Sequence, residues 1–193
     1  MAELDGTGLV VDAGGARALG GHPQVRARVA DLTERGVGLS FDETVDRFIG
    51  TSLAVCLARV GELLGGAPPA DFRAEFAQRT QAAFAAGLST VPGVERVLDA
   101  LAMPYCVASN GNRAKVDFTL GHTGLLPRFA GRIFTADDVQ HPKPAPDLFL
   151  FAARSMGTEP ARTTVVEDTP TGVRVTGTTS SRPYFSTYSS STS

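Results

Sequence analysis

The chain has 193 residues, of which 42% are hydrophobic, and a formal net charge of −2. These values are typical of a globular protein with one core, or one core and a small accessory domain. The mild negative charge gives no reason to expect nucleic acid or an anionic membrane as a partner. No apolar run approaches the roughly 18 to 20 residues of a membrane span, and the N-terminus lacks the basic start of a signal peptide, so we expect a cytoplasmic protein.

The cysteines and histidines show no pattern of a metal site. Cys56 and Cys106 lie far apart, and neither has a Cys or His partner at metal-ligand spacing. We therefore expect both to be buried small side chains in a reducing compartment. The three histidines share no spacing and are expected to be surface or packing residues: His22, His122 and His141.

The first predicted element is a short strand. Residues 9–11 (Leu-Val-Val) form an apolar run that ends at Asp12, with Gly14 and Gly15 behind it. An apolar run bounded by turn residues is typical of a buried strand. Such a strand delivers the carboxylate of Asp12 to its C-terminal end.

Residues 20–88 are predicted to form an all-helical block. Apolar residues recur at helical spacing around Ser40 and Glu43, whose pattern indicates an N-cap with a capping box. A Gly-Gly-Ala-Pro-Pro run at residues 65–69 separates these helices from a further one that begins near Asp71. Three aromatic residues of that last helix are expected in the core of the block: Phe72, Phe76 and Phe84.

After residue 88 the pattern changes to alternating helices and strands. Strands are predicted at residues 105–108, 132–135 and 163–166, and helices at residues 94–101, 116–120 and 147–156. The residues expected to point inward from the first and last of these helices are Val94, Val97, Leu98, Leu101, Leu148, Phe149 and Phe151. This alternation predicts an α/β fold with a doubly wound parallel sheet.

The helical block interrupts this sheet directly after its first strand, which predicts a core domain with an inserted α-helical cap domain. Residues 1–19 and 89–175 are assigned to the core domain and residues 20–88 to the cap domain. Residues 176–193 are rich in serine and threonine and have no periodicity. Such a segment cannot bury enough apolar area to offset the entropy of ordering, so we expect it to be disordered.

Polar side chains occur where the predicted strands end. Asp12, Ser109, Lys143 and the pair Glu167-Asp168 each fall at or just after such an end. Parallel strands bring these ends to one edge of the sheet, where the ligands of open α/β sheets bind. Carboxylates from two strands form an oxygen site suited to Mg²⁺, which usually shares its ligands with a phosphate.

The same edge offers groups that could act on a phosphoryl ester. Ser109 and the backbone N–H groups of Asn110 and Gly111, at a helix start, can hydrogen-bond phosphoryl oxygens. Lys143 can offset the charge that gathers on the phosphoryl group in the transition state. Asp12, kept ionised by the cation and the lysine, can attack phosphorus and form an aspartyl-phosphate.

Each of these residues also has a simpler explanation. Glu167-Asp168 alone could be a solvated turn, and Lys143 an exposed loop lysine between prolines. Asp12 could be a turn aspartate beside Gly14 and Gly15. Their joint occurrence at strand ends favours the site, least strongly for Asp12.

Four sequence blocks resemble the haloacid dehalogenase (HAD) superfamily, in the group with an α-helical cap that includes phosphoglycolate phosphatases and β-phosphoglucomutases. The blocks are Val-Ala-Ser-Asn-Gly at 107–111, Thr-Gly-Leu-Leu-Pro-Arg-Phe at 123–129, Lys-Pro-Ala-Pro-Asp-Leu-Phe at 143–149 and Val-Val-Glu-Asp-Thr-Pro-Thr-Gly-Val at 165–173. They occur in family order, and the resemblance spans about residues 9–174.

The resemblance implies a Mg²⁺-dependent phosphatase that hydrolyses small phosphorylated metabolites, such as sugar phosphates or phosphoglycolate, through an aspartyl-phosphate. The implied site residues form three overlapping sets: catalytic Asp12, Ser109 and Lys143; phosphate-binding Ser109, Asn110 and Lys143; and metal-binding Asp12, Gly14, Glu167 and Asp168. The expected partner is the small substrate, and the expected assembly is a monomer or a weak homodimer. The alternatives are a β-phosphoglucomutase-like phosphotransferase, or a catalytically impaired or truncated member that only binds phosphate.

The chain departs from the family pattern in two places. The family's first motif is Asp-x-Asp-Gly, whose second Asp is the general acid, and with Asp12 as the nucleophile Gly14 stands in the place of that acid. The competing register, residues 3–7 (Glu-Leu-Asp-Gly-Thr), matches the end of the motif better, but it puts Glu at the nucleophile and leaves almost no strand before it. After Val173, family members continue with a helix and at least one more strand, so we expect the C-terminal part of the core to be missing.

Overall fold

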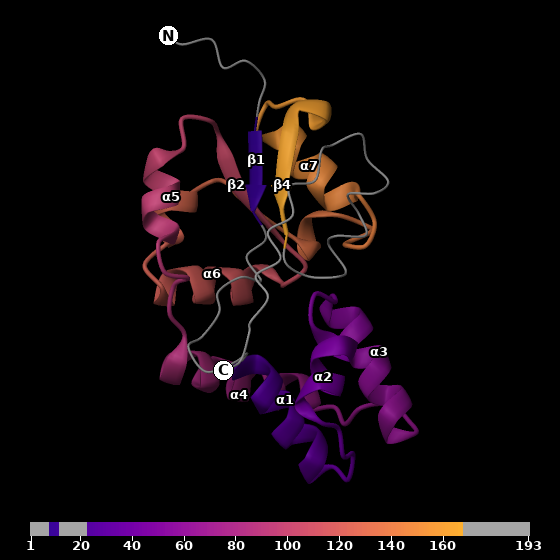
Figure 1. The fold of residues 1–193 in the computed structure, drawn as a ribbon. Helices are drawn as coiled ribbons and strands as arrows, with labels where there is room; N and C mark the ends of the chain where they lie inside the picture. Colours follow the sequence, from indigo (N-terminus) through magenta and orange to yellow (C-terminus); the bar gives the residue numbers. More distant parts are fainter. Residues whose placement is uncertain (1–7, 12–22, 168–193) are drawn as a thin grey trace.

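The protein is represented by a computed structural model that describes residues 8–11 and 23–167 (Figure 1). Three predicted site residues, Asp12, Gly14 and Asp168, lie outside the described residues, as does the low-complexity segment 176–193. None of the described helices combines the length and the apolar character that crossing a membrane requires.

Four parallel strands form one sheet in the order β3-β2-β1-β4. In chain order they are β1 (Gly8–Val11), β2 (Tyr105–Ser109), β3 (Ile133–Thr135) and β4 (Thr163–Val166). β1 lies inside the sheet, where its Val10 pairs with Cys106 on one side and with Val165 on the other. All four predicted strands are present, and the parallel sheet with flanking helices confirms the predicted α/β fold class.

Helices cover both faces of the sheet. Helices α5 (Val94–Ala100) and α6 (Arg113–His122) lie on one face and α7 (Asp147–Ser155) on the other (Figure 1). Along β2, Cys106 packs with Leu148 of α7, while the next residue, Val107, packs with Val116 of α6. Because both faces are buried, β2 is a continuous apolar run without polar alternation.

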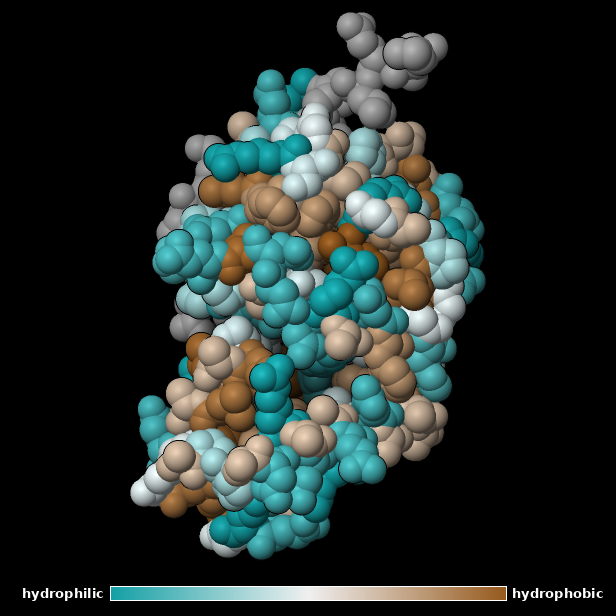
Figure 2. Space-filling view, turned by 180° about the vertical axis from the view of Figure 1, so that it is seen from behind, coloured by the Kyte–Doolittle hydropathy of each residue, from teal (hydrophilic) through white to brown (hydrophobic). Residues whose placement is uncertain are grey.

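The four helices of the N-terminal half form a separate lobe, here called the helical block (residues 23–87). They are α1 (Pro23–Glu34), α2 (Phe41–Phe48), α3 (Leu53–Leu64) and α4 (Phe72–Gly87). Their shared core contains Leu32, Phe48, Cys56, Val60 and Phe72. The block lies beyond the carboxyl ends of the strands, toward which the strand arrows point (Figure 1). The face seen from behind carries interspersed polar and apolar residues on both lobes (Figure 2).

The predicted start of α2 is confirmed in detail. The Ser40 hydroxyl accepts a hydrogen bond from the backbone N–H of Glu43, and the Glu43 carboxylate accepts one from the backbone N–H of Ser40. This capping box pairs two N–H groups that have no partner within the helix. The following helix, α3, begins in a similar way, with Ser52 as its N-cap.

Three predicted inward positions differ from the structure. Val97 is 59% exposed, because α5 has only seven residues and packs on the sheet chiefly through Leu98. Phe151 is 39% exposed, although the edge of its ring still contacts Phe134. Phe84 does not lie in the core of the helical block, because its ring stacks on Phe118 of α6, where the two lobes meet.

Both cysteines are free and buried, as predicted. Burial raises the pKa of the Cys106 thiol to about 12, although the charge of nearby Arg132 acts in the opposite direction. At neutral pH Cys106 is therefore a neutral packing residue of the sheet core rather than a reactive thiolate.

Candidate functional site

The sheet brings three predicted site residues to its carboxyl edge. Ser109 is the last residue of β2, Lys143 lies in the loop between β3 and α7, and Glu167 directly follows β4. The Cα register aligns the ends of β1 and β4, since Val11 pairs with Val166. Parallel strands that end level with one another place the residues that follow them at a common edge.

Lys143 and Glu167 form a buried ion pair at this edge. The Lys143 Nζ donates to Glu167 Oε2 over 2.6 Å, and the two side chains are 2% and 3% exposed. The ammonium group also lies 4.6 Å from the ring centre of Phe149. A charged pair this deep in the protein is held in one geometry, so the position of the ammonium group is fixed.

Ser109 is oriented by a hydrogen bond from the loop that follows it. The backbone N–H of Gly111 donates to Ser109 Oγ over 3.1 Å. The serine hydroxyl thus accepts one hydrogen bond from the protein, and its own proton remains available for an acceptor in the cavity that Ser109 lines. This arrangement can donate to a phosphoryl oxygen.

The amide side chain of Asn110 connects three segments of chain. Its Nδ2 donates to the carbonyl oxygens of Gly50 and Lys143 over 2.9 and 2.8 Å, and its Oδ1 accepts from the backbone N–H of Lys143 over 2.9 Å. Asn110 thus fixes the backbone of Lys143 and ties the loop after α2 to the core. Since its side chain is occupied, the predicted phosphate contact of Asn110 can involve only its backbone.

We predict that Asn110→Ala lowers the free energy of unfolding by about 3 kcal/mol, because buried donors and acceptors of two loops lose their partners. Urea denaturation followed by circular dichroism measures the change. Asn112→Ala is the matched control, because Asn112 caps only the exposed start of α6 and should cost about 1 kcal/mol. Equal effects of the two substitutions would contradict the connecting role of Asn110.

The predicted metal site is only partly within the described residues. Asp12, Gly14 and Asp168 lie outside them, and the described residues include no group of three or more His, Cys, Asp or Glu side chains placed to hold a metal. Glu167 is the one predicted metal ligand that is described, and its carboxylate lies at the expected edge. The metal-binding set therefore stays a prediction.

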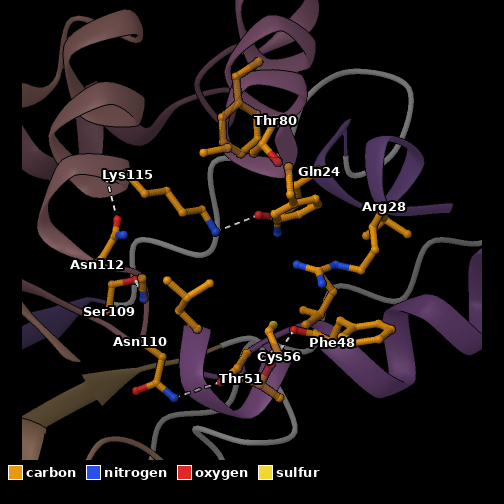
Figure 3. Close-up of a pocket in the computed structure, with 18 of the residues that line it drawn as sticks. Gln24, Arg28, Phe48, Thr51, Cys56, Thr80, Ser109, Asn110, Asn112 and Lys115 are labelled. Carbon is orange, nitrogen blue, oxygen red and sulfur yellow. Dashed lines mark hydrogen bonds between the residues drawn. The ribbon is translucent and has the colours of Figure 1, made fainter. Parts of the chain in front are cut away.

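A cavity of about 220 Å³ lies between the strand ends and the helical block. Ser109 and Lys143 line it from the core, and α1, α2, α3 and α4 line it from the block. In the close-up, Ser109, Asn110 and Lys115 lie on one side of the cavity, and the guanidinium of Arg28 points into it from the other (Figure 3).

Among the described residues, two hydrogen bonds connect the lobes at this cavity. Lys115 Nζ of α6 donates to Gln24 Oε1 of α1 over 2.7 Å, and Asn110 Nδ2 reaches Gly50. The sequence does not single out Gln24, Arg28 or Lys115. The only signal in the sequence is the four-residue spacing of Gln24 and Arg28, which places both on one face of α1, and many surface helices share this spacing.

The chain is similar in sequence to known hydrolases. Residues 4–175 match the family of haloacid dehalogenase-like hydrolases. The 6-phosphogluconate phosphatase of Escherichia coli is 31% identical over 151 residues, which cover 77% of this chain and 68% of that protein. Protein CbbY of Rhodobacter capsulatus is 33% identical over 129 residues, or 61% of this chain and 56% of that protein.

Solved structures are similar over most of the chain. A haloacid dehalogenase-like protein of unknown function from Agrobacterium tumefaciens is 27% identical, with a TM-score of 0.71 over 91% of this chain and 80% of its own. CbbY from Rhodobacter sphaeroides in complex with phosphate, at 22% identity, shares the fold with a TM-score of 0.75 over 91% of this chain and 84% of its own. The chain therefore belongs to the haloacid dehalogenase-like hydrolase family, as its four sequence blocks indicate.

Proposed function

We propose that this chain, a phosphomonoester hydrolase of the haloacid dehalogenase-like family, removes the phosphoryl group from small phosphorylated metabolites of the sugar phosphate or phosphoglycolate class. The observation that carries the proposal is the buried Lys143–Glu167 pair at the strand ends, together with the cavity that Lys143 and Ser109 both line. These groups offer a cation and a hydroxyl donor to a phosphoryl oxygen.

In the proposed reaction, Asp12 attacks phosphorus while the bond to the leaving oxygen breaks, which gives an aspartyl-phosphate and an alcohol. Ser109 donates a hydrogen bond to a phosphoryl oxygen, and Lys143 offsets the negative charge of the group. With glycine at position 14, the proton for the leaving oxygen comes from solvent rather than from a side chain. Water then attacks the aspartyl-phosphate and releases inorganic phosphate.

The proposed ligands suit Mg²⁺, because Glu167, Asp12 and Asp168 all offer carboxylate oxygens. Of these three residues, Glu167 lies within the described part of the chain. The backbone carbonyl at Gly14 completes the proposed set. Bound there, the ion would supply positive charge to the phosphoryl group. Lys143 holds the carboxylate of Glu167 in place for this role through their 2.6 Å contact.

We further propose that the helical block is the cap of this enzyme. It covers the strand ends and contributes most of the cavity lining, so it can exclude bulk water from the reacting group. A relative of similar sequence is named a 6-phosphogluconate phosphatase, which supports a phosphorylated sugar or sugar acid as substrate. A cytoplasmic location and a monomer or weak homodimer stay predictions.

Phosphate release from p-nitrophenyl phosphate tests the proposal. We expect turnover with Mg²⁺, and a loss of about 100-fold when EDTA removes divalent cations, because the ion supplies several kcal/mol of charge stabilisation. Added Mg²⁺ should restore the rate. Turnover that is indifferent to EDTA would contradict the metal, and the absence of turnover at any Mg²⁺ concentration would contradict the hydrolase activity of this chain.

Gly14 in place of the general acid favours a second candidate, a family member that binds phosphate without turning it over. Calorimetric titration with inorganic phosphate separates the two, because a silent member binds phosphate yet releases none from an ester. A β-phosphoglucomutase-like phosphotransferase is the remaining alternative, and it would convert a sugar phosphate to its isomer instead of releasing phosphate.

A further inference from the structure

Arg28 of α1 is a buried cation, and one of its guanidinium nitrogens has no hydrogen-bond partner among the described residues. The residue is 6% exposed, and its Nη1 is a buried atom without a hydrogen-bond partner among the described residues. Its guanidinium carbon lies 4.5 Å from the ring centre of Phe48 and 3.9 Å from that of Phe76. The rings fix the guanidinium in position, and it points into the cavity (Figure 3).

The acid nearest along the helix does not neutralise Arg28. Asp31 is fully buried, but its carboxylate lies 3.5 Å from Arg35 and 3.9 Å from Arg79, whereas no described carboxylate lies within 4.0 Å of Arg28. Burial lowers the pKa of Arg28 below its usual value, and the nearby Cys56 and Asp31 offset only part of this shift. The guanidinium group stays charged although it is buried against aromatic rings. Burying a charge costs free energy unless an anion binds to it.

The rest of the cavity has the same sign of charge. Its described lining contains four cations and no aspartate or glutamate: Arg28, Arg73, Lys115 and Lys143. Of these, Lys143 belongs to the proposed phosphoryl site and Lys115 donates to Gln24. Arg28 lies in the helical block, across the cavity from Ser109 (Figure 3). A substrate whose single phosphoryl group binds at the strand ends would therefore place no anion next to Arg28.

A purely structural role explains less of this arrangement. A cation stacked on two aromatic rings stabilises the core of the helical block, and this role would be complete if every N–H group of Arg28 were paired or solvated. An unpaired, buried N–H group on a side chain that lines a cavity instead destabilises the free protein. Such groups commonly serve to reject ligands that lack the matching acceptor.

We propose that Arg28 binds a second oxyanion of the substrate, a carboxylate or a second phosphate at the end remote from the transferred phosphoryl group. This inference rests on the proposed function and narrows its substrate class to phosphorylated metabolites with two anionic ends. A guanidinium forms short, charge-assisted hydrogen bonds with either group. The aromatic and threonine side chains that also line the cavity suit a short polyhydroxylated carbon chain.

Initial rates with three six-carbon substrates test the assignment. Glucose 6-phosphate has a neutral far end, 6-phosphogluconate a carboxylate, and fructose 1,6-bisphosphate a second phosphate. We expect kcat/KM to be at least about 10-fold higher for one of the doubly anionic substrates, and Arg28→Gln to lower that value about 100-fold while changing glucose 6-phosphate less than about 3-fold. The substrate that loses most identifies the carboxylate or the phosphate.

Arg28→Lys is the conservative variant, because it keeps the charge, and it should retain part of the preference. Arg47→Gln on the exposed side of α2 is the matched control and should leave all three substrates unchanged. Wild-type protein without a preference for a doubly anionic substrate would overturn the proposal. An equal loss on all three substrates in Arg28→Gln, with an unchanged melting temperature, would also overturn it.

Binding keeps the test independent of catalysis. In thermal melts, 6-phosphogluconate or fructose 1,6-bisphosphate should raise the melting temperature more than glucose 6-phosphate does, and Arg28→Gln should abolish the difference.

If p-nitrophenyl phosphate is not turned over but this difference appears, the hydrolase proposal fails and the Arg28 site stands. If turnover occurs but neither the rates nor the melts depend on Arg28, the hydrolase proposal stands and the Arg28 site fails. If Arg28→Gln does not fold, the rates and melts are compared for Arg28→Lys instead. The assignment is overturned if Arg28→Lys keeps the full substrate preference of the wild type and if all three substrates raise the melting temperature of the wild type equally.

Discussion

Gly14→Asp is expected to raise kcat for p-nitrophenyl phosphate by about 10²- to 10⁴-fold, the usual contribution of a positioned general acid. The sequence places glycine two residues after Asp12, where the family motif has the acid that protonates the leaving oxygen. The substituted carboxyl group would supply that proton and then activate water. Steady-state rates over a range of pH measure the gain, which should be lost as pH rises above the pKa of the new carboxyl group, because a general acid acts only when it is protonated.

Asp12→Asn completes this test, because it removes the proposed nucleophile and should abolish turnover. Glu3→Gln is the control for the competing register, in which Glu3 takes the place of the nucleophile. If Gly14→Asp gives no gain and Asp12→Asn no loss, the register is wrong. A loss on Glu3→Gln alone would transfer the nucleophile to the competing register.

Lys143→Met is expected to lower the free energy of unfolding by about 3 to 5 kcal/mol and to abolish phosphate release. The stability loss arises because Glu167, 3% exposed, keeps a buried charge without the ammonium group 2.6 Å away. For a chain of this length the change corresponds to a fall in melting temperature of roughly 6 to 20 °C. Urea denaturation and thermal melts measure both quantities.

A double-mutant cycle separates stability from chemistry. Lys143→Met combined with Glu167→Met replaces both charges by apolar side chains, so most of the lost stability should return while activity stays absent. Arg113→Met is the surface control, because its pair with Asp117 is exposed and should contribute at most about 0.5 kcal/mol. A small stability loss in Lys143→Met, similar to that of the surface control, would show that the buried pair does not hold this edge together.

The strands were predictable because their signals are local. β2 is a continuous apolar run that ends in polar residues, because both faces of the sheet are covered there, and β4 is a β-branched run that ends in two acidic residues. The capping box at Ser40 is equally local, since its groups are three residues apart. Val97 was predicted inward and is exposed, because a two-turn helix buries only a narrow stripe and periodicity does not define how wide that stripe is.

The convergence of Ser109, Lys143 and Glu167 also followed from the sequence, although they are 24 to 58 residues apart along the chain. Parallel strands with short links have few possible arrangements, and all of them bring strand ends to one edge. The sequence did not indicate that Glu167 pairs directly with Lys143, or that the amide of Asn110 connects loops. Those contacts depend on loop conformations that no local pattern specifies.

By itself, then, the sequence determined the elements, the parallel sheet, the family and the edge at which the proposed chemistry takes place. Only the tertiary structure decided how the helical block faces that edge: which side chains line the cavity, and that the guanidinium of Arg28 lies near the rings of Phe48 and Phe76. The physical reason is that hydrogen bonding and apolar periodicity act between near neighbours and leave a pattern in the chain. The environment of a single cation on α1 is instead set by side chains from α2 and α4, which become its neighbours only after the helices pack.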